Sequence, residues 1–199
     1  MTPARRRSDA EQNRARILDA AREYVVASND LKLNEIAKAA GVGQGTLYRH
    51  FPTREALLAE VYQADVEALV AAAPDLLAEH PPIEALARWL RKVAEYAKVK
   101  RGVFAAATAA VRSDLAGHSI GPIGDAITAL LDAGKAQGQI RDTADARDVI
   151  LLLGFLTDLD DAEWDLRAQR LLDIILDGLR QEAKPQRART RRAAPHTGC

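Results

Sequence analysis

One short segment, QGTLYRH, carries a dense set of hydrogen-bonding side chains. Gln44 can bond the edge of an adenine, and Arg49 can reach a guanine or a phosphate. Thr46, Tyr48 and His50 are short or rigid donors suited to phosphate oxygens. We expect Gln44 to discriminate between bases and Tyr48 and Thr46 to anchor the backbone. The chemistry that these residue types predict is therefore recognition of DNA.

Two predicted helices would position these side chains. Residues 32–40 form a short helix ended by Gly41, and residues 44–51 form another that a proline ends. Small side chains at Ala37 and Ala40 permit the two helices to cross closely. A short helix, a turn that contains glycine and a second helix predict a helix-turn-helix, whose second helix enters the major groove of DNA.

Further basic residues flank this segment. Arg54 lies in the first turn of the next predicted helix, whose free amides would add to a phosphate clamp. Residues 5–7 are three arginines, which we place before the first helix as an arm on the phosphates or in the minor groove. That helix is expected to open at Ser8, because Ser8 and Glu11 have the spacing of a capping box.

Apolar residues recur at spacings of three and four almost throughout the chain, which predicts an all-α protein. Thr53 is expected to cap a longer helix that ends near Pro74, because proline lacks an N–H and disrupts a helix interior. Gly and Pro residues then divide the remainder. The expected loop is 116–121, and the expected helices are 83–98, 102–114, 122–137, 144–157 and 163–182.

The last two predicted helices are the most apolar, with hydrophobic residues on nearly all sides. A helix that is apolar all round must be buried all round. In a chain of 199 residues the natural second cover is another subunit. We therefore predict a homodimer, with an interface that includes Leu152, Phe155, Leu172, Ile175 and Leu179.

Composition excludes several classes of protein. The longest apolar run, residues 149–156, is far below the ~18 to 20 residues of a membrane span, so we expect no membrane helix. The N-terminus has arginines but no apolar stretch behind them, which argues against a secretory signal. The only cysteine is Cys199, so no disulfide framework forms within one chain, and a cytoplasmic location is expected.

The formal net charge of zero conceals unlike parts. Residues 1–52 hold nine basic and six acidic side chains, residues 53–182 hold 14 and 22, and residues 183–199 hold five and none. Such asymmetry points to an anionic partner for the ends rather than a uniformly neutral body. The last segment has no core-forming residues, and we expect it to be a disordered basic tail.

The stretch IAKAAGVGQGTLYRHFPTREALL resembles the DNA-binding signature of TetR-type transcriptional repressors, and RARILDAAREYVVA resembles the first helix of that family. The resemblance covers roughly residues 12–62. It implies a helix-turn-helix domain over 1–53 and a helical effector-binding and dimerisation domain over 54–182, followed by the tail. It also implies a homodimer that binds a palindromic operator in double-stranded DNA and leaves it when a small molecule binds.

The resemblance extends to single positions. It places Gln44, Gly45, Leu47, Tyr48 and Arg49 near bases or adjacent backbone; Thr46, Tyr48, His50 and Arg54 on phosphates; and Asn34 at a position that sometimes reads a base. Lys32 departs from the pattern, because the family usually has a Ser or Thr cap there, and two alternatives stay open: a shifted start of this helix, or a cap by Asp30. Gly43 replaces a frequent Ser, and Arg54 replaces a Lys while keeping the charge.

A small-molecule effector would bind between helices of the second domain, among apolar walls with a few polar groups. The candidate pocket residues lie on the middle helices or the loop after them: Trp89, Tyr96, Phe104, Thr108, Arg112 and His118. If Arg112 faces inward, an anionic or carbonyl effector is expected.

Other chemistry finds little support. The glycine-rich turn follows a helix and lacks the Lys-Ser/Thr of a nucleotide-binding loop. The acidic cluster 158–165 lacks the glycine of a calcium loop, no second ligand follows His118 at helical spacing, and His80 adjoins a proline loop. We predict no catalytic residues, metal or cofactor. Two alternatives stay open: a helical enzyme that retains a helix-turn-helix, and a structural DNA-binding protein without an effector.

Overall fold

The computed structural model describes residues 3–27 and 31–181, without the side chains of residues 3–8 and 165. The prediction of an all-α fold is confirmed. The helices are α1 (Pro3–Ala27), α2 (Leu33–Ala39), α3 (Gln44–His50), α4 (Arg54–Glu79), α5 (Pro82–Ala106), α6 (Ala109–Ala136), α7 (Ala146–Leu152), the 3-10 helix η1 (Leu153–Thr157) and α8 (Asp161–Leu179).

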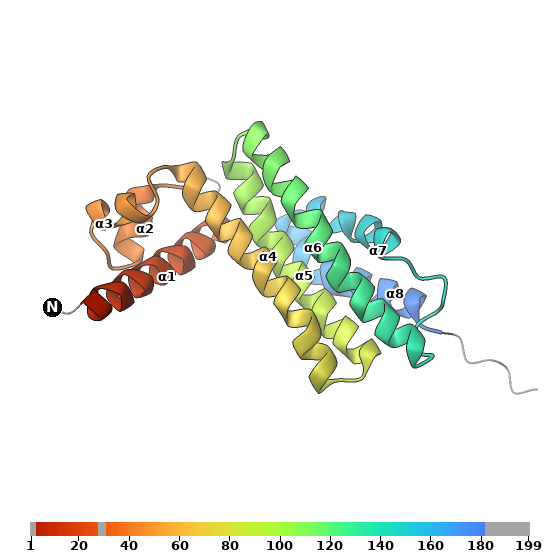
Figure 1. The fold of residues 1–199 in the computed structure, drawn as a ribbon. Helices are drawn as coiled ribbons and strands as arrows, with labels where there is room; N and C mark the ends of the chain where they lie inside the picture. Colours follow the sequence, from red (N-terminus) through yellow and green to blue (C-terminus); the bar gives the residue numbers. More distant parts are fainter. Residues whose placement is uncertain (1–2, 28–30, 182–199) are drawn as a thin grey trace, which may run out of the picture.

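Two regions follow from this order (Figure 1). Helices α1, α2 and α3 form a small lobe, here called the head. Helix α4 leads from the head along the rest of the molecule, here called the body, where α5 and α6 pack against it. Helices α7, η1 and α8 complete the body. One continuous set of buried apolar side chains runs through both regions, because α1 also packs against α4 and α5.

The first helix begins earlier than expected. Helix α1 starts at Pro3, at a position where proline costs nothing because its missing N–H would have no helical partner. Ser8 therefore lies inside the helix and is not its cap, and the arginines at 5–7 lie on α1 rather than before it. Their side chains fall outside the described part of the chain. The predicted role as an arm is not tested.

Helix α4 does not end at Pro74, and that prediction is wrong: the helix continues to Glu79. Leu69 and Ala73 are buried just before the proline, and the Trp89 Nε1–H of α5 donates a hydrogen bond of 2.9 Å to the carbonyl of Leu69. A proline inside a helix costs roughly 3 kcal/mol. Packing against α5 and α6 along the full length of α4 outweighs that cost.

The middle of the body is also simpler than predicted. Residues 116–121 are not a loop, and Pro122 starts no helix, because α6 runs through both. Gly102 lies inside α5, and the actual break falls at Thr108, whose hydroxyl caps α6 by accepting from the Val111 N–H. Ser119 is 3% exposed, so the segment is fixed by its burial against neighbouring helices.

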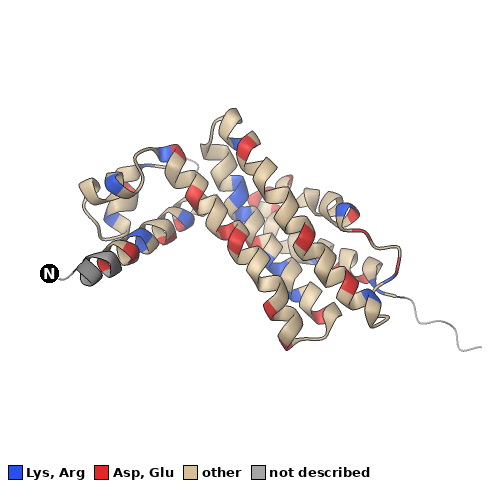
Figure 2. Ribbon diagram, viewed as in Figure 1, with Lys and Arg blue, Asp and Glu red and all other residues tan. Residues whose placement is uncertain are grey.

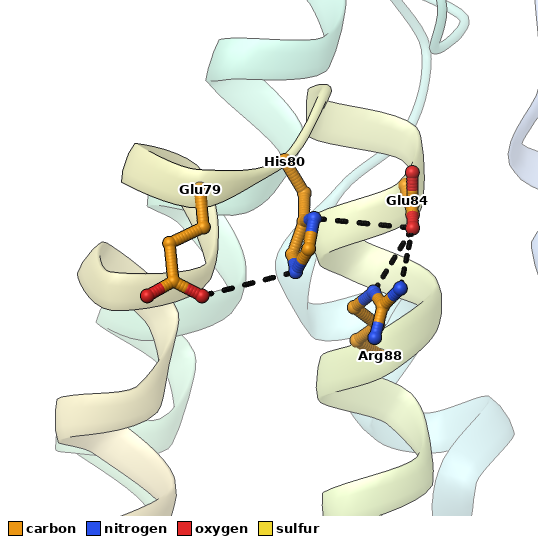
Figure 3. Close-up of polar contacts among 4 residues, drawn as sticks. All are labelled: Glu79, His80, Glu84 and Arg88. Atoms are coloured by element: carbon orange, nitrogen blue, oxygen red, sulfur yellow. Dashed lines mark hydrogen bonds and ion pairs between the residues drawn. The ribbon is translucent and has the colours of Figure 1, made fainter.

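The connection from α4 to α5 lies at the end of α4 remote from the head. Pro81 and Pro82 start α5, and an ionic cluster surrounds the turn (Figure 3). The Glu84 carboxylate accepts hydrogen bonds of 3.0 and 2.7 Å from the Arg88 guanidinium. The Nδ1 atom of His80 lies 3.9 Å from the same carboxylate. The hydrogen bonds from Arg88 lower the pKa of Glu84 below its ordinary value.

The end of the body corrects part of the predicted interface. Leu172 and Leu179 are 1% and 7% exposed within one chain, so they belong to its own core. They face inward because α8 packs against α5. Leu152 stays 53% exposed, and Phe155 and Ile175 are half-buried. Exposed apolar residues that the sequence prediction omitted lie on the same two helices: Leu151, Leu166 and Ile174.

Candidate nucleic-acid interface

The turn between α2 and α3 has a specific backbone geometry. Gly41 has φ +64°, in the left-handed region that glycine adopts without the cost of a Cβ clash. The N–H of Gly41 bonds the carbonyl of Lys38 at 3.1 Å, and the N–H of Val42 bonds the carbonyl of Ala37 at 2.9 Å. These bonds satisfy the last carbonyls of α2 and set the direction of α3.

Side chains from all three helices form the centre of the head. Ile36 and Ala37 of α2 and Ile17 of α1 are 0 to 2% exposed. Leu47 of α3 is 0% exposed, so it cannot touch DNA, and its predicted place near the bases needs correction. The buried Leu47 side chain instead holds α3 in position. As a consequence, residues 44, 45, 48 and 49 of the same helix face outward.

The outer face of α3 carries the predicted recognition residues. Gln44, Gly45 and Arg49 are exposed, and Tyr48 is 46% exposed. Gln44 and Tyr48 are four residues apart, as are Gly45 and Arg49, so the four share one face. Arg49 folds back along the helix: its Nε donates to the Gly45 carbonyl at 2.9 Å and its Nη2 to the Thr46 hydroxyl at 3.3 Å.

Gly45 is the second residue of α3 and is exposed. A Cβ at this position would meet nothing within 4 Å. The packing of the chain itself therefore gives no reason for glycine. Glycine does permit a close approach of an external backbone to α3, which agrees with the predicted DNA-facing role.

Arg54 opens α4 beside the head. Its Nε–H is buried and has no hydrogen-bond partner in the described part of the chain. A buried donor left unpaired costs about 1 to 3 kcal/mol. Thr53 caps the same helix by accepting from the Ala56 N–H at 3.1 Å. Backbone amides and a guanidinium thus converge at the start of α4, as expected for a phosphate clamp.

The remaining predicted residues lie around this face. Thr46 and His50 are half-buried on α3, and Asn34 is exposed on α2. Lys32 precedes α2 and provides no side-chain cap. The alternative cap, Asp30, lies outside the described residues.

Two supporting contacts were not predicted from the sequence. Arg14 of α1 pairs with Glu60 of α4, and its guanidinium lies 5.6 Å from the centre of the Phe51 ring. The Tyr24 hydroxyl of α1 donates to the Glu35 carboxylate of α2. Both contacts fix the helices that carry α3. The helical periodicity of α1 alone could not reveal them, because each partner comes from a different helix.

Charge is distributed unevenly between the two regions (Figure 2). The described segment 31–51 carries Lys32, Lys38 and Arg49 against one acid, Glu35. Helix α4 carries acidic residues along its length, from Glu55 onward. A polyanion would therefore be attracted to the α2–α3 end and repelled by much of the body.

The body places the candidate effector residues in different surroundings. Trp89 is 0% exposed and belongs to the core, Thr108 is an exposed helix cap, and exposed His118 lies 3.5 Å from Asp114. None of these three borders the hollows that the other candidates line, and their pocket role stays a prediction. Packing decided their orientation, which helical spacing does not fix.

Tyr96, Phe104 and Arg112 do line hollows. Tyr96 borders a cavity of about 120 Å³ between α5, α6 and the α7–η1 segment. Phe104 and Arg112 border an adjoining hollow of about 360 Å³. Lys100 lines both, although the sequence prediction omitted it. The spacing 96, 100, 104 on one helix face was the available signal.

A helix-turn-helix head with an exposed polar face, joined to an all-helical body, defines a DNA-binding transcriptional regulator. Residues 17–61 match the model of the bacterial regulatory proteins of the tetR family, and residues 81–181 match the C-terminal domain of SbtR-like transcriptional regulators. The chain belongs to the TetR family.

Known relatives agree with this assignment. The crystal structure of the TetR regulator SCO0520 from Streptomyces coelicolor is 42% identical, with a TM-score of 0.76 over 85% of this chain and 99% of that one. A TetR regulator from Mycobacterium vanbaalenii is 33% identical, with a TM-score of 0.69 over 87% and 98%. Among curated relatives, an HTH-type transcriptional regulator of Staphylococcus aureus is 37% identical over 79 residues, which is 38% of this chain and 41% of that protein. The fold and the family are those of regulators, not enzymes.

In the described part of the chain, no helix is both long and apolar enough to cross a lipid bilayer.

Proposed function

We propose that this regulator is a repressor that binds a palindromic operator as a homodimer and leaves it when a small molecule binds to the body. The exposed face of α3, with the unpaired Arg54 donor beside it, is the observation that carries the DNA-binding part. Membership of the TetR family supports the repressor role. Binding of chromosomal DNA places the activity in the cytoplasm.

The roles of the head residues follow from their exposure. Gln44 is exposed in the first turn of α3 and would read a base, whereas Tyr48 and Thr46 would bond phosphate oxygens. Arg49 would exchange its bonds to Gly45 and Thr46 for a base or phosphate. Arg54 would gain the acceptor that it lacks.

The dimer would form through the last two helices. Leu151 and Leu152 of α7 are 65% and 53% exposed, and Leu166 and Ile174 of α8 are 79% and 57% exposed. Leu166 and Ile174 are eight residues apart and so share a face of α8. Large exposed apolar side chains on the last two α-helices would be covered in such an interface. Two-fold symmetry would place the two α3 helices in successive major grooves, ~34 to 36 Å apart.

The contact between head and body provides a route for release. Gly102 of α5 lies against the end of α1, where a Cβ would come within 1.8 Å of the Val25 carbonyl oxygen. Lys100 and Arg101 lie in the same turn of α5 and line the hollow of about 360 Å³. A ligand that moves this turn of α5 would tilt α1 and change the distance between the two α3 helices. Tighter binding of the ligand to the tilted state would then weaken operator binding.

Salt-dependent gel shifts on the DNA that flanks the protein's own gene test the proposal. We expect a specific palindromic site whose affinity falls as salt rises. Binding that is equal on every sequence would contradict the repressor and favour a structural DNA-binding protein. Leu166→Glu should dissociate the dimer in sedimentation. Persistence of the dimer in this variant would place the interface elsewhere.

A further inference from the structure

The cavity between α5, α6 and the α7–η1 segment has an apolar interior. Its volume is about 120 Å³, and six Val, Ile and Leu side chains line it: Val93, Ile120, Ile123, Ile150, Leu153 and Leu156. An apolar cavity of about 150 Å³ accommodates one benzene. This cavity, here called the chamber, therefore fits a short aliphatic tail or a single ring.

Hydroxyl groups at the wall do not offer protons to a ligand. The Tyr96 hydroxyl donates to the Tyr62 hydroxyl at 2.8 Å, and Tyr62 donates to Ser119 at 2.8 Å. Ser119 in turn donates to the Ala116 carbonyl at 3.1 Å. Burial raises the pKa of Tyr96, so this group stays neutral. Since each of these three hydroxyl protons already has an acceptor, these hydroxyls provide no donor for an anionic group inside the cavity.

The mouth of the chamber, unlike its apolar interior, is lined by basic side chains. Lys100 and Thr157 border both the chamber and the adjoining hollow of about 360 Å³, which Arg101, Phe104 and Arg112 also line. The Lys100 ammonium lies 5.3 Å from the centre of the Phe104 ring. Arg101 pairs with Asp161 at 2.9 Å, whereas Arg112 donates only to the carbonyl of Phe104. In the described part of the chain, no carboxylate forms an ion pair with Lys100 or Arg112.

Burial makes the charge on Lys100 costly. Removal from water lowers the pKa of its ammonium below the ordinary value for lysine. An anion at the mouth would stabilise the charged form, and it would be bound in a partly desolvated place where such a pair is stronger than in water.

We propose that this cavity binds an amphipathic monocarboxylate, with its apolar tail in the chamber and its carboxylate on Lys100, next to Arg112. The inference rests on the proposed effector-controlled function and names the chemical class of the effector. The tail displaces poorly bound water from aliphatic walls. The carboxylate gains the Lys100 ammonium, which among the described residues is the one lysine that borders both hollows.

Calorimetric titration of the full-length protein without DNA tests this site. The probes are linear carboxylates from propanoate to decanoate, with 1-hexanol as the neutral match for hexanoate. We expect affinity to rise about fourfold per methylene until the tail fills the chamber, and then to stop rising. Hexanoate should bind about tenfold more tightly than 1-hexanol.

Two variants and a control assign the preference to Lys100. Lys100→Met keeps the length of the side chain and removes the charge, so hexanoate and 1-hexanol should bind equally. Lys100→Arg should keep the preference. Lys92→Met is the matched control, because Lys92 is exposed on the same helix and lines neither the chamber nor its mouth. Circular dichroism of each variant would establish that it is folded.

Three results would overturn the proposal: no binding by any carboxylate, equal binding of hexanoate and 1-hexanol to the unaltered protein, or a preference that survives in a folded Lys100→Met. Gel shifts with hexanoate distinguish the site from the function. Binding with the expected preference that leaves the operator complex intact would support the carboxylate site and contradict release through it.

Discussion

The head and the body use polar groups in opposite ways. In the head, Gln44 and Tyr48 face outward, and at the adjoining start of α4 the Arg54 Nε–H lacks a partner within the described chain. In the body, the hydroxyls of Tyr62, Tyr96 and Ser119 satisfy one another. Unsatisfied or exposed groups mark a surface that an external ligand completes, whereas a closed chain of hydrogen bonds marks a wall. The same residue type, tyrosine, is therefore exposed in one region, where we propose that it binds DNA, and is part of the packed interior in the other.

The largest expected effect tests whether the head depends on one buried side chain. Leu47→Ala should lower the free energy of unfolding by about 3 kcal/mol, because it leaves a cavity beneath α3. Chemical denaturation measures the loss. Leu166→Ala is the control, because Leu166 is 79% exposed. This substitution should leave the free energy of unfolding of the monomer unchanged. Equal losses in both variants would contradict the burial assigned to Leu47.

The junction of the two regions gives the next effect. Gly102→Ala should cost about 1 to 3 kcal/mol or displace α1, because the new Cβ would overlap the Val25 carbonyl. Gly117→Ala on α6 meets nothing within 4 Å and should stabilise the protein by up to about 1 kcal/mol. Thermal or urea unfolding compares the pair. A stable Gly102→Ala with unchanged operator binding would exclude this contact as the route of release.

Operator binding separates the roles within the head. Tyr48→Ala should weaken binding to every sequence by about 1 to 3 kcal/mol, because it loses a phosphate anchor. Gln44→Ala should mainly relax the preference at one base position. Gel shifts on operators with single base changes measure both. Uniform losses in both variants would contradict the division into anchor and reader.

The two tyrosines can be compared directly by removing one hydroxyl from each. Tyr62→Phe should destabilise the fold by about 1 to 2 kcal/mol, because Tyr96 loses its acceptor and Ser119 loses its donor. Tyr48→Phe should leave stability unchanged and weaken DNA binding. Denaturation and gel shifts on both variants give the comparison. A destabilised Tyr48→Phe would show that the exposed hydroxyl has a structural partner.

The smallest effect concerns the ionic cluster at the α4–α5 turn (Figure 3). Arg88 lowers the pKa of Glu84. The stabilisation of the fold by the ionised Glu84 is therefore present above the ordinary pKa of 4.5 and is lost as pH falls through the lowered value. Glu84→Gln should therefore reduce the melting temperature slightly at pH 7, and this difference should shrink steadily as the pH falls below 4.5. A difference that does not shrink at acidic pH would contradict an ionic origin.

Sequence patterns predicted the head more accurately than the body. The ends of α2 and α3 were predicted to within about a residue, since Gly41 and Pro52 act on the backbone next to them. In the body, Pro74, Gly102 and Pro122 were expected to end or begin helices, but they lie inside α4, α5 and α6. Long helices packed along their length tolerate such residues, because tertiary burial exceeds the local cost.

The orientation of the candidate site residues was likewise easier to predict in the head than in the body. The outward face of α3 followed from spacing, because residues four apart share a helix face. The inward turn of Leu172 and the outward turn of His118 did not follow, because their helices are apolar or mixed on several sides. Lys100 was missed for a related reason. Its importance depends on two hollows whose walls come from four different elements.

By itself the sequence determined that the protein is helical, that a glycine turn joins two short helices, and that α3 presents a polar face. These properties follow from backbone preferences and periodicities over a few residues. Only the tertiary structure decided that Arg54 lacks a partner, that Gly102 touches α1 and that Lys100 stands at the mouth of an apolar chamber. Each of these depends on which distant side chains meet, and that is set by packing of the whole chain.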